Sequence, residues 1–169
     1  MSINPDTLLY NLGYMANILQ TTSIILGLGL FMSGLFRLKR YGEMRTFMSQ
    51  QMTLAGPLLM LIAGISLLCL PFVLSTALLN TWGTTSPLRY SGPTNSGYEQ
   101  LIPSVIMFVR LIGVGAFIRG IVLFSRGGRE GSAPGSIGKA MLHVMGGLLC
   151  VHILGTVDLL RSILGYTVY

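Results

Sequence analysis

The sequence predicts an all-α membrane protein with four transmembrane helices, arranged as two tandem helical hairpins of the same orientation. The first observation is composition: 51% of the 169 residues are hydrophobic and only 9% are charged. Soluble domains carry about a quarter charged residues, so most soluble classes are excluded. The second is that the apolar residues fall in long runs, with a mean hydropathy of +0.70. The third is that the two halves of the chain share a glycine motif.

Four apolar runs are long enough to cross a bilayer, which requires about 20 residues. They are expected at about Tyr14–Phe36, Leu54–Leu78, Leu101–Phe124 and Met141–Ile163. Hairpin one then covers residues 14–78, residues 79–100 form an outer loop, and hairpin two covers 101–163, all within a single membrane domain over 1–169. Pro71 is expected to kink the second span or to end its regular part.

The basic residues predict the orientation of these spans. Most of them lie in two segments, one after the first span and one after the third: Arg37, Lys39, Arg40, Arg45, Arg126, Arg129 and Lys139. Because segments rich in Lys and Arg stay on the cytoplasmic side, both are predicted to be cytoplasmic loops and both termini to be outside. The net charge of +6 is thereby explained by topology, so no specific nucleic-acid binding is expected.

The shared motif indicates an internal duplication. Gly27–Phe31 (Gly-Leu-Gly-Leu-Phe) aligns with Gly113–Phe117 (Gly-Val-Gly-Ala-Phe), and the match continues with Gly34 over Gly120. Chance is the alternative, because Gly and Phe are common in such helices. Small residues let helices approach closely in lipid, which predicts helix-packing or oligomerisation contacts at Gly27, Gly29, Gly34, Gly113, Ala116 and Gly120. The glycine stripes could join the hairpins within one subunit or join subunits.

No arrangement typical of catalysis is present in the sequence, so an enzyme, a catalytic residue and a cofactor are not expected. His143 and His152 are nine residues apart on one predicted helix, and therefore lie on opposite faces. They cannot share a metal ion without another helix, so no metal site is expected. Each is interpreted as a hydrogen-bonded packing or interface residue.

Arg110 is the charge that most requires an explanation, because it lies about 13 Å below Leu101 on its helix, near the middle of the membrane. Such an arginine faces a partner, a water-filled cavity or a lumen. Asp158 lies near the outer end of the fourth span, within reach of an arginine side chain, and forms a local pair with Arg161 in the simpler interpretation. Two hypotheses therefore remain for Arg110: a buried pair with Asp158, or contact with a lumen or a lipid phosphate.

The stretch Gly113–Leu123, which contains Phe117-Ile118-Arg119-Gly120, is followed by a Gly-rich basic loop and by Gly138-Lys139 at the start of a Gly-rich span. In these features, and in its four-span layout, the chain resembles the IcmC/DotE family of type IVB secretion systems, whose conjugative-plasmid relatives are called TraQ. The resemblance covers roughly Asn17 to Gly165. It implies a small subunit of the bacterial inner membrane and no known catalytic residues to transfer. The outer side, on which the basic residues predict both termini, is then the periplasm.

The function expected from this resemblance is a structural or conduit-forming subunit of a machine that exports proteins or DNA–protein complexes. Its expected partners are other inner-membrane subunits of the secretion system, in a homo- or hetero-oligomer, and the membrane lipid. Conjugative pilin subunits have the same span, basic loop, span layout, which is an analogy at the level of fold. The alternative is a stand-alone small channel or transporter. The spans contain few polar residues, which counts against this alternative because a substrate path normally needs several.

Overall fold

The computed structural model describes residues 5–47, 54–84, 101–127 and 135–165, in which all regular structure is helical. The helices are α1 (Pro5–Phe47), α2 (Ala55–Leu68), α3 (Leu70–Trp82), α4 (Leu101–Gly127), α5 (Ser136–Val151) and α6 (Ile153–Ile163). The all-α class is confirmed. Two helices, α1 and α4, are long and apolar enough to cross a membrane, and the number rises to four if each of the bent pairs α2–α3 and α5–α6 is one span.

Helix α1 is longer than the predicted first span. Its 43 residues correspond to about 65 Å at 1.5 Å per residue, about twice the apolar thickness of a bilayer. Arg37, Lys39, Arg40 and Arg45 therefore lie on a continuous helix, and the prediction that they form a loop is wrong. The segment after Phe36 contains no proline to end the helix, and Lys39 pairs with Glu43 one turn later at 3.8 Å.

The predicted second and fourth spans are not continuous helices. Helices α2 and α3 meet at an angle of 91°, and α5 and α6 meet at 98°. The first bend is at Cys69, and Pro71 lies in the first turn of α3, which confirms that Pro71 ends the regular part of the span. The second bend is at His152, where no proline occurs and the sequence predicted no break.

Side-chain hydroxyls bond to carbonyls that the two bends leave without a helical partner. Pro71 has no N–H to donate to the Leu67 carbonyl, and the fully buried Ser23 of α1 donates its Oγ–H to that oxygen at 2.7 Å. At the second bend the Thr156 hydroxyl donates to the Leu149 carbonyl at 2.9 Å. A carbonyl left unpaired in an apolar environment, whether protein or lipid, is costly, so these bonds stabilise both bends.

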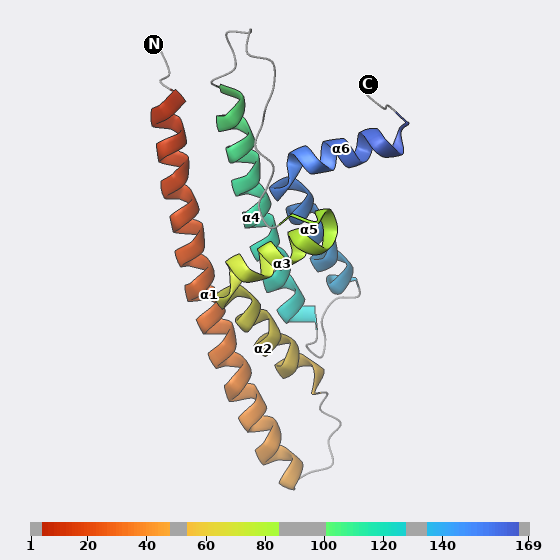
Figure 1. Cartoon of the computed structure of the whole chain (residues 1–169). Coiled ribbons are helices and arrows are strands. Elements are labelled where there is room, and N and C mark those ends of the chain that lie inside the picture. Colours follow the sequence, from red (N-terminus) through yellow and green to blue (C-terminus); the bar gives the residue numbers. More distant parts are fainter. Residues whose placement is uncertain (1–4, 48–53, 85–100, 128–134, 166–169) are drawn as a thin grey trace.

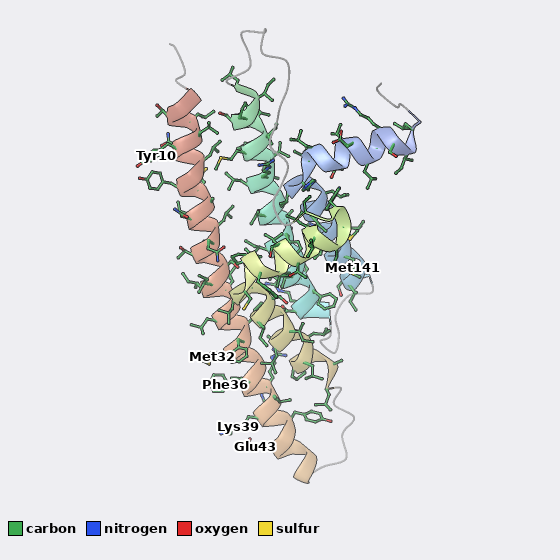
Figure 2. The ribbon with its side chains drawn as sticks, in the orientation of Figure 1. Tyr10, Met32, Phe36, Lys39, Glu43 and Met141 are labelled. Carbon is green, nitrogen blue, oxygen red and sulfur yellow. The ribbon has the colours of Figure 1, made fainter. Side chains whose placement is uncertain are left out.

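The six helices form two hairpins that pack side by side (Figure 1). Helix α1 packs along α2, α4 packs along α5, and α2 also contacts α4. The core lies where the hairpins meet, and its buried apolar side chains are Ala63, Leu67, Leu70, Phe117, Ile118 and Ile121. Large apolar side chains also cover the outside, and Figure 2 shows Met32 and Phe36 pointing away from the other helices. A surface made largely of exposed apolar side chains is typical of a protein surrounded by lipid.

Candidate functional site

The glycines of hairpin two bring α4 and α5 into backbone contact. A Cβ added to Gly113 would lie 2.8 Å from the Gly147 carbonyl oxygen, and one added to Gly147 would lie 2.7 Å from the Phe117 nitrogen. Both distances are shorter than real Cβ contacts allow, so only glycine fits at these two positions. Gly120 lies two helical turns beyond Gly113, and a Cβ added there would approach the Val144 nitrogen at 2.8 Å.

Hairpin one has corresponding contacts. A Cβ on Gly27 would lie 3.0 Å from the Gly64 carbonyl oxygen, and one on Gly64 would lie 2.7 Å from the Phe31 nitrogen. Gly34 faces Leu61 in the way that Gly120 faces Val144. The two hairpins therefore have one packing geometry, in which a glycine on each second helix contacts the glycine and phenylalanine of the shared motif.

Gly29, another small residue of the motif, lies outside these contacts. A Cβ added to Gly29 meets no atom within 4 Å, and Gly29 is exposed. Gly29 therefore makes no packing contact within the chain, because it is two residues from Gly27 and faces away from α2. Its predicted alternative role in oligomerisation stays a prediction. Ala116 is half-buried. Gly64 and Gly147, which make the backbone contacts on the second helix of each hairpin, are not among the packing residues that the sequence predicted.

A buried polar cluster forms at the bend between α5 and α6. The ring of His152, which is 1% exposed, stacks on Trp82 with ring centroids 4.8 Å apart and planes 18° apart. Its Nε2 lies 3.3 Å from the Thr84 hydroxyl oxygen. A Cβ added to Gly155 would collide with the His152 ring, so the glycine provides the space that the histidine occupies.

The structure does not form the predicted pair between Arg110 and Asp158. In the described segments the salt bridges are Lys39–Glu43 and Asp158–Arg161, the latter at 4.0 Å between exposed side chains. The bend at His152 turns α6 away from α4, and Asp158 is on α6 beyond that bend. Arg110 is half-buried, and both it and Asp158 are close enough to His152 to interact electrostatically with its ring.

Because Arg110 and Asp158 form no salt bridge, we expect their substitutions to act independently. The effects of Arg110→Leu and Asp158→Leu on thermal stability in detergent should add in the double variant to within about 0.5 kcal/mol. Asp158→Leu alone should cost under about 1 kcal/mol, because its pair with Arg161 is exposed. A coupling well above 1 kcal/mol would show that the two charges pair after all.

The other basic residues lie at helix ends. Arg126 is exposed in the last turn of α4, and Lys139 is exposed in the first turn of α5. The Lys139 carbonyl oxygen is 2.8 Å from His143 Nδ1. Arg129 is outside the described residues, as is the side chain of Arg45. The basic residues that the structure describes at the two hairpin turns thus lie on helices rather than in loops. Of the residues predicted to form basic loops, Arg129 alone is outside the described helices.

The arrangement described above consists of close helix packing at the glycines and of charged side chains at the helix ends. In the parts of the chain that the structure describes, no group of three or more His, Cys, Asp or Glu side chains could hold a metal ion. No family model matches the chain, and comparisons with curated proteins and with solved structures also give no match.

Proposed function

We propose that this protein is a structural or conduit-forming subunit of a bacterial type IVB secretion or conjugation machine in the inner membrane. The observation that carries the proposal is the stretch Gly113–Leu123, through which the chain resembles the IcmC/DotE family. Gly113 and Gly120 of this stretch are also the residues of α4 that contact α5. A packing role for this motif suits a scaffold, since it builds the hairpin and needs no ligand.

The uncovered apolar surface supports assembly into a larger oligomer with other inner-membrane subunits. The closest glycine contacts are used inside the chain, which leaves the opposite faces of α1 and α5 to lipid or to neighbours. On α1 this outer face includes Ile25, at 66% exposed, and Phe36, at 71%, and on α5 it includes Leu142, at 74%. Lipid and other transmembrane helices are the partners that such faces fit.

The proposed topology has four crossings, made by two hairpins of the same orientation. Its support is the corresponding glycine contacts of α1–α2 and α4–α5, and the parallel course of α1 and α4 (Figure 1). Both basic turns then lie in the cytoplasm, and both termini lie in the periplasm. In each bent pair, the helix that packs along α1 or α4 carries the chain through most of the bilayer.

We expect cysteine labelling to report this topology. Single cysteines at Ser2, Gly128 and Thr167, in a chain whose Cys69 and Cys150 are replaced by serine, are treated in intact spheroplasts with a membrane-impermeant maleimide. The two terminal positions should be labelled, and position 128 should react only after the membrane is permeabilised. Labelling of position 128 alone in intact spheroplasts would contradict the orientation.

The function is tested by transfer in the bacterium that encodes the chain. Deletion of the gene should abolish export of a reporter effector or transfer of a mobilisable plasmid, and a plasmid-borne copy should restore it. The chain should also co-purify in mild detergent with other inner-membrane subunits of the apparatus. Unchanged transfer by both routes after deletion would refute the proposal. Two variants of the plasmid-borne copy are compared in the same assay. Gly147→Val should not restore transfer, whereas Gly146→Ala should restore it.

A stand-alone channel or transporter is the second candidate, and the paired bends favour it. Broken helices at corresponding positions of two repeats form the substrate sites of many transporters. Here the bends at Cys69 and His152 correspond, and His152 lies within electrostatic reach of Arg110. This candidate predicts ion or solute flux through proteoliposomes that contain the purified chain alone, with loss of flux in Arg110→Leu.

A further inference from the structure

Helix α6 leaves the body of the protein at nearly a right angle. It follows α5 after a bend of 98° and projects sideways from the hairpins (Figure 1). Beyond its first turn, every residue from Val157 to Leu164 is exposed. The 11 residues of α6 correspond to about 16 Å, which is about half the thickness of the apolar core of a bilayer. Helix α6 is therefore too short to cross the membrane by itself.

The exposed residues of α6 divide into two faces at 100° per residue. The apolar face consists of Val157, Leu159, Leu160, Ile163 and Leu164. The opposite face has Asp158, Arg161 and Ser162. Leu160 is 51% exposed, Ile163 72% and Leu164 69%, so the described segments of the chain leave the apolar face uncovered. Asp158 and Arg161 pair along the polar face.

Neither water nor hydrocarbon suits both faces of α6. Water would surround a continuous row of leucine and isoleucine side chains, and hydrocarbon would surround two charges. The boundary between them satisfies both faces, because an amphipathic helix there buries its apolar side and leaves its polar side in contact with headgroups and water.

We propose that α6 lies flat in the membrane–water interface, with its apolar face among the acyl chains and its polar face toward the phospholipid headgroups. The position of α6 at a membrane–water interface does not depend on the proposed function. That this interface belongs to the outer, periplasmic leaflet rests on the proposed topology.

The bend holds α6 at the angle this position requires. Trp82 is of the residue type that concentrates at membrane interfaces, and its ring stacks on His152 immediately before α6. Thr156 donates its hydroxyl hydrogen bond to the carbonyl oxygens of Leu149 and His152, at 2.9 and 3.0 Å. The start of α6 is therefore anchored to an interfacial aromatic residue and to the end of α5.

Spin-label accessibility in lipid vesicles tests this position. Single cysteines at Val157, Asp158, Leu160 and Ser162, in a chain with Cys69→Ser and Cys150→Ser, carry a nitroxide after purification. The protein is reconstituted into vesicles of phosphatidylethanolamine and phosphatidylglycerol, and relaxation by oxygen and by a water-soluble nickel complex is measured. Ile25→Cys, on the lipid-facing side of α1, is the control for a site in the bilayer, and gel-filtration retention checks that each variant folds.

The proposal predicts that oxygen relaxes the labels at 157 and 160 several-fold more than nickel does, and that the ratio is reversed at 158 and 162. Depth should alternate along the helix without a steady trend. A depth that increases continuously from 157 to 162 would show that α6 crosses the membrane, and high nickel access at all four positions would show that it lies in water. Protection of 157 and 160 from both reagents would show that protein covers the face. Each of these three results overturns the proposal, whatever the outcome of the transfer assay.

Discussion

Gly147→Ala is expected to separate α5 from α4 and to lower the stability of the protein strongly. The added Cβ would lie 2.7 Å from both the Gly113 carbonyl oxygen and the Phe117 nitrogen. These are backbone atoms, so no side-chain rotation can relieve the collision, and the helices must move apart. Overpacking costs about 1–3 kcal/mol, and loss of close approach removes the main source of helix association in lipid. Thermal unfolding in detergent, followed by near-ultraviolet circular dichroism, measures the loss.

The adjacent glycine provides a matched control. A Cβ on Gly146 meets no atom within 4 Å, and alanine is favoured over glycine within helices by about 1 kcal/mol. Gly146→Ala should therefore leave the midpoint of unfolding unchanged or raise it. Gly64→Ala should behave like Gly147→Ala, since its Cβ would lie 2.7 Å from the Phe31 nitrogen. Equal stability of the Gly146 and Gly147 variants would show that α4 and α5 do not pack in this register.

Gly155→Ala is expected to expel the His152 ring from its site and to change the direction of α6. The new Cβ would collide with the imidazole and would lie 2.9 Å from Trp82 Cδ1. Because His152 is stacked on Trp82 and almost fully buried, the ring has no free space into which to move. We expect a loss of roughly 1–3 kcal/mol, as for other overpacked sites. Trp82 is the only tryptophan of the chain, so its emission maximum and intensity report the displacement directly.

A second substitution, at His152, distinguishes this steric collision from a loss of stability that does not involve the imidazole ring. Removing the imidazole in His152→Ala vacates the volume into which the Gly155 Cβ would project, so adding Gly155→Ala to His152→Ala should cost little. The two changes are therefore expected to be strongly non-additive. If Gly155→Ala lowers stability by the same amount with and without His152, the collision is not the cause.

The sequence alone determined the membrane class, the helical class and the residues that carry the close packing. Long apolar runs and the scarcity of charge are sufficient for the first two, because lipid requires every backbone group to be bonded within a helix. Gly27, Gly34, Gly113 and Gly120 could be found as well, since a seven-residue spacing places each pair on one helix face. Pro71 identified one of the two bends, because proline cannot continue the backbone hydrogen bonds of a helix.

Only the tertiary structure decided what those residues contact and where the other helix breaks. Gly64 and Gly147 became evident as contact partners once the register of α1 with α2 and of α4 with α5 was fixed. The bend at His152 depends on a stacked Trp82, on the space above Gly155 and on the hydroxyl of Thr156. A helix with no proline breaks only where such contacts replace its lost hydrogen bonds, and contacts between distant segments are not encoded in local spacing. For the same reason the sequence left open whether Asp158 pairs with Arg110 or only with Arg161. The structure contains the local pair with Arg161, because the bend turns α6 away from α4.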